Sequence, residues 1–314
     1  MSSIDLSKVL SECQFVLVAC GAGFSADSSL PVYSDIAQIE VYKKLDLTYH
    51  DLCRPNVMLA EGDLNDKELF LGFWANCFNL YRSTTPHRGY DILKKWNNEI
   101  NVPLEFKLYQ QQFLKVNYNR DVHVDDVAGP MFIYTSNVDA HFHRYFEKNQ
   151  IYEIHGNVEH WQCQNKNCEY CDVQKINDNH VFDVDPSNMK CCLDNFLSCK
   201  CGELMRPNVL MFGDEHYVQD EEQEQRYVAW EAAVEHFIKD NKTYGLVILE
   251  MGCGTNVPSV RMECEEVLSD TNDKSLLVRI NPCDEVNLPH HAVHVQDTSL
   301  NTLERLAKQM LFNK

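Results

Sequence analysis

The sequence has 314 residues, of which 44% are hydrophobic, and its 28 basic and 47 acidic residues give a net charge of −19. This length allows one large domain or two modest ones, with a sizeable buried core. The acidic balance argues against a protein that coats nucleic acid, because binding phosphates requires a basic surface. It leaves room for a small basic patch around an anionic cofactor. No apolar run approaches the roughly 20 residues that a membrane-spanning helix needs.

The cysteine content indicates the compartment. The N-terminal stretch MSSIDLSKVLSECQF lacks a positive segment followed by an apolar one, so we do not expect a secretory signal. We therefore expect the protein in the reducing cytoplasm. There the 14 cysteines are thiols or metal ligands rather than disulfides. Seven of them fall between Cys163 and Cys201, which predicts a separate small module.

Short apolar runs rich in β-branched residues alternate with segments of helical spacing. The runs are Phe15–Cys20, Met131–Thr135, Gly245–Glu250 and Leu276–Ile280. Continuous apolar strands are typical of a parallel sheet that is covered on both faces. Helices are expected at Gly89–Trp96 and Glu222–Lys239, and the stretch 36–127 is expected to be mostly helical with a loop-rich part near 121–130. The alternation predicts an α/β fold with a Rossmann-like, doubly wound parallel sheet.

A glycine-rich loop follows the first predicted strand. Gly21, Gly23 and Ala26 satisfy the pattern G-x-G-x-x-G/A, in which glycines allow a tight turn and a close approach of backbone to a pyrophosphate. A plain strand-to-helix turn is the alternative. The acid expected about 20 residues later is at best Glu40, which follows no clear second strand. Pro31 predicts that the next helix is very short or absent, so this is not an ordinary dehydrogenase fingerprint.

The cysteine-rich segment has the spacing of a zinc site. Cys163 and Cys168 form one pair, and Cys199 and Cys201 form a second, tighter pair about 30 residues later. Two such pairs supply a tetrahedral zinc ion, and four thiolates leave no open position for water, so the zinc would be structural. Three further cysteines compete for the same roles: Cys171, Cys191 and Cys192. Redox use of the Cys168–Cys171 pair is a further alternative, but it lacks a βαβ context.

Polar residues follow two of the apolar runs. Asn137 and Asp139 come after the second predicted strand, where an amide and a carboxylate can bind a carboxamide or sugar hydroxyls. His155 precedes a glycine at the end of another short strand and is a candidate general base, because its pKa lies near neutrality. A lone histidine is more often structural, and His141, His143 and His160 are nearby. The segment 206–213 is expected to be an apolar strand that ends at Phe212.

In this order the segments resemble the sirtuins, the family of NAD-dependent protein deacylases. The family pattern GAGxSxxSGIP resembles GAGFSADSSLP here, TQNxD resembles TSNVD, and HG resembles IHG. Further on, CGGxLRPDVVxFGE resembles CGELMRPNVLMFGDE, GTS resembles GCGTNVP, and INxE resembles RINP. Each motif is short, but six in the right order between about residues 15 and 300 make a specific resemblance. In detail the chain is more similar to the TSNVD-type sirtuin-like proteins common in bacteria than to the best-known eukaryotic deacetylases.

The resemblance implies NAD and a structural zinc ion as cofactors and acyl-lysine proteins or peptides as substrates. Products would be lysine, nicotinamide and O-acyl-ADP-ribose. The residues that it implies at the NAD site are Gly21, Ala22, Gly23, Ser25, Tyr33, Ser136, Asn137, Asp139, Gly252, Gly254, Thr255 and Asn281. The implied catalytic residues are His155, as general base, with Asn137 and Asp139. Phe212 would line the substrate tunnel, and the backbone near Val209 would pair with the peptide as an added strand. The implied zinc ligands are Cys163, Cys168, Cys199 and Cys201.

The resemblance also implies a division of the chain. A large NAD-binding domain would comprise segments of about 1–40, 125–160 and 207–314. A helical insertion would span about 41–124, and the zinc-binding module about 161–206. We expect no direct nucleic-acid binding and no membrane association, and the sequence does not indicate an oligomeric state.

The chain departs from the family at the cofactor end. The family has Asp-Phe-Arg where this chain has Val32, Tyr33 and Ser34, and it has Gln in place of Ser136. Ser34 supplies no guanidinium, so these changes affect deacylation more than NAD binding. Two other functions remain as alternatives: an ADP-ribosyltransferase or NAD hydrolase on the same fold, and a non-catalytic sensor of NAD or ADP-ribose. The intact His155 argues against the sensor.

Overall fold

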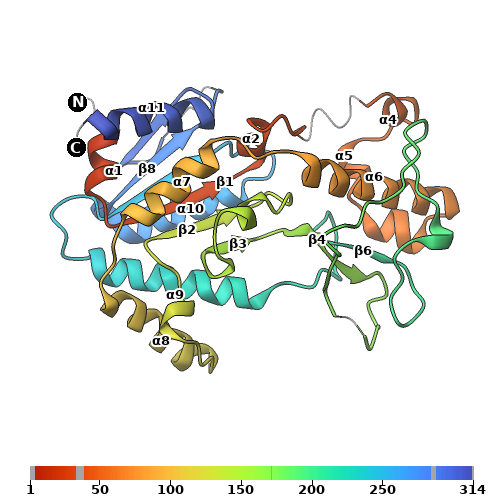
Figure 1. Ribbon diagram of the computed structural model, residues 1–314, viewed down its shortest axis with the longest axis horizontal. Coiled ribbons are helices and arrows are strands. Elements are labelled where there is room, and N and C mark those ends of the chain that lie inside the picture. Colours follow the sequence, from red (N-terminus) through yellow and green to blue (C-terminus); the bar gives the residue numbers. More distant parts are fainter. Residues whose placement is uncertain (1–3, 33–38, 171, 284–287, 313–314) are drawn as a thin grey trace.

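A six-stranded parallel sheet forms the centre of the larger part of the molecule (Figure 1). The computed structural model describes residues 4–32, 39–170, 172–283 and 288–312. The strand order is β3-β2-β1-β7-β8-β9. The strands are β1 (Phe15–Cys20), β2 (Met131–Thr135), β3 (Ile151–Glu153), β7 (Leu246–Met251), β8 (Ser275–Ile280) and β9 (Ala292–Val295). The chain proceeds outward from β1 in one direction and from β7 in the other, so the strand order reverses between these two strands.

Helices cover both faces of this sheet (Figure 1). One face packs against α1 (Leu6–Glu12), α7 (Gly89–Glu99) and α11 (Ser299–Phe312). The other face packs against α8 (Leu104–Tyr118), α9 (Glu221–Ile238) and α10 (Ser259–Thr271). Successive side chains of β1 alternate between the two cores: Val16 and Val18 face the first, and Phe15 and Leu17 face the second. Both faces are apolar because both are buried, which explains the continuous apolar runs.

A second, antiparallel sheet with the order β5-β4-β6 lies in the smaller part of the molecule. Its strands are β4 (Gly156–Cys163), β5 (Gln174–Lys175) and β6 (Met205–Val209). It shares a core with the long helix α6 (Leu64–Ser83), where Trp74 and Trp161 are both fully buried. The shorter segments of the chain are α2 (Ala22–Ala26), α4 (Glu40–Lys44), α5 (Tyr49–Leu52), the π-helix η1 (Asn56–Glu61), and the 3₁₀ turns η2 (Val124–Asp126), η3 (His141–Arg144), η4 (Lys148–Gln150), η5 (Leu193–Asn195) and η6 (Asn272–Lys274).

The predicted α/β fold is confirmed, and most predicted elements agree with the observed ones to within one to three residues. The helix after the glycine loop has only five residues, as Pro31 indicates. The prediction that the strand after the cysteine module ends at Phe212 was wrong. The observed strand β6 ends at Val209 and belongs to the smaller sheet. The chain leaves that sheet because the Leu210 amide donates to the His155 carbonyl and the Phe212 amide donates to the Cys53 carbonyl.

The division of the chain into three parts stays a prediction. Within the expected insertion, α6 packs on β4, whereas α7 packs on α11 and α8 packs on α9. The helices α7 and α8 therefore belong to the layers of the large sheet. None of the helices in the described ranges has the length and apolar character needed to cross a membrane.

Candidate functional site

Three glycines join the two loops that meet where the strand order reverses. The Gly23 amide donates to the Gly252 carbonyl over 3.0 Å, and the Gly21 amide donates to the Met251 carbonyl at the same distance. A Cβ atom on Gly21 or Gly23 would lie 2.8 or 2.7 Å from the backbone of Gly252. Gly252 itself has a φ of +63°, which favours glycine. The loops after β1 and β7 can pack this closely only because these positions lack side chains.

A cavity of about 400 Å³ opens beyond these loops. Seven predicted cofactor residues line it: Gly21, Ala22, Gly23, Ser136, Gly252, Gly254 and Asn281. Thr255 lies in the same loop but does not line the cavity, and Val32 does. Tyr33 and Ser34 lie outside the described residues. The cavity occupies the crevice at the carboxyl ends of the strands, where doubly wound sheets bind ligands.

The other predicted cofactor residues form a buried polar cluster beside this cavity. The Ser25 hydroxyl donates to an Asp139 carboxylate oxygen over 2.5 Å, and the Asn137 amide nitrogen donates to Ser25 Oγ over 3.1 Å. The second Asp139 oxygen accepts the His141 backbone N–H over 2.8 Å. The Thr135 hydroxyl accepts the Asn137 backbone N–H over 3.0 Å. Each member is less than 10% exposed, so the orientation of the Asn137 and Asp139 side chains is fixed before any ligand binds.

His155 lies in the turn between β3 and β4 and does not itself line the cavity. The backbone N–H of the neighbouring Ile154 donates to the Thr135 carbonyl at the end of β2. The His155 carbonyl accepts the backbone N–H of Leu210. Burial lowers the pKa of the His155 imidazole, and a hydrogen bond with the Ser136 backbone partly offsets this effect. Ser136 lines the cavity, so this hydrogen bond joins His155 to the cavity wall. The imidazole is therefore neutral at physiological pH and can accept a proton.

Gly156 makes this position of His155 possible. Its φ is +67°, and a Cβ atom there would lie 2.1 Å from the Asn208 carbonyl oxygen. The turn and strand β6 are thus in direct backbone contact. Val209 pairs with Gly156 across the smaller sheet and is buried. Phe212 is 40% exposed, and its ring lies 4.5 Å from the ring of His50.

The four predicted zinc ligands meet at one point in the smaller part of the molecule. The sulfur atoms of Cys163, Cys168, Cys199 and Cys201 all lie within 4.8 Å of one another. Two of the distances, Cys163–Cys201 and Cys168–Cys199, are 3.6 and 3.5 Å. A tetrahedral zinc ion with Zn–S bonds of about 2.3 Å requires sulfur–sulfur distances of about 3.8 Å. The four thiolates therefore fit a structural zinc ion.

Two of the competing cysteines lie outside this cluster. The Cys191 thiol contacts the Glu68 carbonyl, and Cys192 is exposed at the start of η5. Cys171 lies outside the described residues.

Several residues at the crevice belong to none of the motifs that the sequence displays. Asp27 lines the cavity and accepts the Leu300 backbone N–H at the start of α11 over 2.7 Å. Thr298 and Ser299 line it as well, and the Thr298 hydroxyl accepts the Asn301 N–H. The sequence Asp-Thr-Ser before an apolar helix is a helix-start signal that points to this region.

A buried ion pair supports the loop that follows β7. Glu250 and Arg279 lie at the ends of β7 and β8, and both are less than 3% exposed. Two hydrogen bonds of 2.8 Å join them. The Arg261 guanidinium donates to the Cys253 carbonyl over 2.9 Å. These contacts hold the loop 252–254 against the ends of β7 and β8 and against α10.

The crevice fits a dinucleotide. Glycine backbone lines it instead of bulky side chains, so phosphates can approach the main chain closely. The helix α10 begins at Ser259 without a side-chain cap, and Asn256, Val257 and Val260 of this region line the cavity. Uncapped N–H groups at the start of a helix favour anions.

Comparison with known proteins agrees with this geometry. A sequence model of the Sir2 family matches residues 122–233. An NAD-dependent protein deacetylase of Oceanobacillus iheyensis is 25% identical over 206 residues, which cover 65% of this chain and 64% of that protein. One of Shouchella clausii is 22% identical over 209 residues, which cover 65% of this chain and 63% of that protein. The match thus spans slightly under two thirds of the length of both relatives.

Solved structures show the same fold over nearly the whole chain. A Sir2 homologue in complex with NAD matches with a TM-score of 0.58, 16% identity, and coverage of 98% of this chain and 94% of that one. Sir2Tm bound to a propionylated peptide matches with a TM-score of 0.57, 15% identity and 98% coverage of both chains. The chain is therefore similar to the Sir2, or sirtuin, proteins: the family model matches residues 122–233, and the solved Sir2 structures share its fold.

Proposed function

We propose that the chain is an NAD-dependent protein-lysine deacylase. The observation that carries the proposal is that the buried Ser25–Asn137–Asp139 cluster and His155 both adjoin the end of β2. Asn137 bonds Thr135, and His155 bonds the backbone of Ser136, which lines the cavity. A sensor that only binds a nucleotide needs no neutral imidazole at the cavity wall. The two bacterial relatives named above as NAD-dependent protein deacetylases support the same activity.

The residues of the crevice have separable roles in this proposal. NAD supplies an electrophilic ribose carbon and nicotinamide as its leaving group. The glycine loops 21–23 and 252–254 bind its phosphates through the backbone. Asn137 and Asp139 hold the nicotinamide ribose and carboxamide in a fixed orientation, which lowers the entropy cost of reaching the reactive geometry.

His155 acts as the general base on a ribose hydroxyl. Because burial lowers its pKa, the imidazole is unprotonated at neutral pH and needs no further activation. The rate should therefore fall when the pH drops below this lowered pKa. The hydrogen bond with the Ser136 backbone fixes the ring relative to the cavity.

We propose that an acyl-lysine peptide enters from the side of the smaller sheet. The strand β6 is an edge strand of that sheet, and an edge can accept an extended peptide as an added strand. Phe212, exposed beside His50, would contact the acyl-lysine side chain. The zinc ion would hold the smaller part in shape without taking part in the chemistry. We propose a reducing, cytoplasmic location, where a cluster of four thiols suited to zinc stays reduced.

The test is mass spectrometry of the purified protein with NAD and a library of acetyl-lysine peptides. The proposal predicts deacetylated peptide and O-acetyl-ADP-ribose, both absent with His155→Ala. His236→Ala is the control, because it removes an imidazole from the exposed side of α9 that lines neither the cavity nor the pocket of Asp139. ADP-ribose or an ADP-ribosylated protein without deacetylation would replace the proposal with a hydrolase or a transferase.

A further inference from the structure

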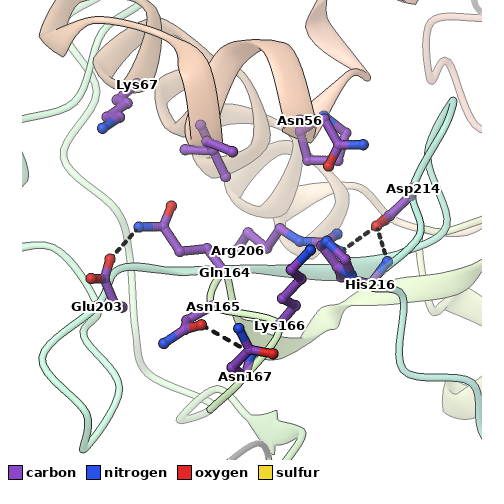
Figure 2. Close-up of a pocket in the computed structure, with 13 residues that line it drawn as sticks. Asn56, Lys67, Gln164, Asn165, Lys166, Asn167, Glu203, Arg206, Asp214 and His216 are labelled. Atoms are coloured by element: carbon purple, nitrogen blue, oxygen red, sulfur yellow. Dashed lines mark hydrogen bonds and ion pairs between the residues drawn. The ribbon is translucent and has the colours of Figure 1, made fainter.

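A second polar pocket lies between the cysteine cluster and the helices of the smaller part, away from the NAD crevice (Figure 2). Its volume is about 450 Å³. The floor comes from loop 164–167, which joins two zinc ligands, and from Arg206 on β6. The opposite wall comes from η1 and the start of α6. None of the roles proposed above uses this pocket.

The pocket has an unusual charge for this chain. Three cationic side chains and two anionic ones line it, although the whole chain carries a net charge of −19. Arg206 is paired with the Asp214 carboxylate over 2.7 Å, and both side chains are at most 2% exposed. The side-chain ammonium groups of Lys67 and Lys166 have no ion pair or hydrogen bond with any residue that the structure describes. Two ammonium groups are therefore available to an anion from outside.

Two acceptor oxygens at the pocket lack donors. One Asp214 oxygen accepts both from Arg206 and from the His216 amide, while the other is buried and has no partner within the described part of the chain. The Gln164 amide nitrogen donates to Glu203 over 2.7 Å, which leaves its buried oxygen without a donor too. Gln164 and Asp214 lie toward opposite ends of the pocket, with Arg206 and Lys166 between them (Figure 2). Buried acceptors in proteins nearly always have a donor from protein, water or a ligand, so both oxygens can accept from a hydroxyl that enters the pocket.

We propose that this pocket binds a phosphorylated sugar. Lys166, beside Arg206 and His216, holds the phosphoryl group, and Lys67 adds positive charge on the other side of the pocket (Figure 2). The unpartnered oxygens of Asp214 and Gln164 accept hydrogen bonds from sugar hydroxyls. A sugar phosphate carries an anion and several compact donors in one small molecule, which matches both features of the pocket. An acidic peptide would satisfy the lysines, but its backbone N–H groups are flanked by bulky groups and reach a recessed oxygen poorly.

The test is calorimetric titration of the full chain with ribose 5-phosphate. The proposal predicts one site whose affinity falls at least tenfold in the Lys67→Ala/Lys166→Ala variant. The matched control is Lys94→Ala/Lys107→Ala, which removes the same charge from α7 and α8 and should leave the affinity unchanged. This pair of variants also separates the pocket from the NAD crevice, which none of the four lysines lines.

The hydroxyl contacts are tested with ligand fragments and one further variant. Inorganic phosphate and free ribose should each bind at least tenfold more weakly than ribose 5-phosphate. Gln164→Leu should weaken ribose 5-phosphate and leave inorganic phosphate unaffected. Equal affinity of the two lysine variants, equal affinity for phosphate and ribose 5-phosphate, or binding of an acidic peptide in place of the sugar phosphate would each overturn the proposal.

Discussion

Replacing Gly252 by alanine should damage both the stability and the cofactor site. The added Cβ would lie 2.3 Å from the Phe24 amide nitrogen and 2.4 Å from the Gly23 carbonyl carbon. Ordinary contact begins near 3.4 Å, so the loops must separate by about 1.1 Å (3.4 − 2.3). That movement would break the 3.0 Å hydrogen bond between Gly23 and Gly252.

The magnitude follows from two costs. Holding an alanine at a φ of +63° costs about 1 kcal/mol, and forcing a packed backbone apart costs about 1–3 kcal/mol more. We expect the free energy of unfolding to fall by about 2–4 kcal/mol in urea denaturation followed by tryptophan fluorescence. The affinity for NAD, measured by calorimetry, should fall at least tenfold because both loops line the cavity.

Gly254→Ala is the matched control for the stability measurement. It lies two residues away in the same loop, and an added Cβ there would meet no atom within 4 Å. We expect its free energy of unfolding to stay within about 0.5 kcal/mol of the parent. Equal stability and equal NAD affinity of Gly252→Ala and the parent would refute the close packing of the two loops.

Three other perturbations test the remaining parts of the account. Purified protein should contain one zinc ion per chain, and a chelator should increase hydrogen exchange across 156–209 while β1 stays protected; a fully folded, zinc-free chain would contradict a structural ion. Arg279→Met should cost about 1–3 kcal/mol in urea denaturation, because the buried Glu250 loses two hydrogen bonds and keeps its 3.7 Å contact with Arg261; an unchanged midpoint would argue against the pair. Burial, and to a lesser extent Glu263, raise the pKa of Glu231 to about 8. The folded chain therefore holds a proton that the unfolded chain releases near pH 4.5, and the free energy of unfolding falls as the pH rises from 4.5 to 8. Glu231→Gln should remove this fall and raise the stability at pH 8.5 by on the order of 1 kcal/mol after solvent screening; identical pH profiles of variant and parent would contradict it.

The elements predicted best from the sequence are those for which local pattern and tertiary burial agree. Strands β1 and β2 were predicted to the residue because every side chain in them is buried on one face or the other. Cysteine spacing predicted the zinc cluster but left Cys171, Cys191 and Cys192 as competitors. The four thiols that meet are the set that the resemblance implied. Strand β9 was missed because Ala292–Val295 is only half-buried at the edge of the sheet and has no continuous apolar run.

Other features depend on contacts that no local pattern contains. The end of β6 is set by the Cys53 carbonyl, which accepts from Phe212 across more than 150 residues of chain. The ion pair between Glu250 and Arg279 joins β7 to β8. The sequence of each strand shows only one charged residue in an apolar run, and this pattern does not predict that the two are partners. The position of His155 at the crevice needed the resemblance to the family, because the chain has 13 histidines and periodicity distinguishes none of them.

The central claim is that cleavage of NAD is coupled to removal of an acyl group at the His155 crevice. The most direct test is to count nicotinamide and deacetylated lysine in the same reaction with an acetyl-lysine peptide. The account predicts one nicotinamide per deacetylated lysine, and almost no nicotinamide when the peptide is omitted. Steady nicotinamide release without peptide, or release that exceeds deacetylation severalfold, would contradict the claim and show that the chain cleaves NAD for another purpose.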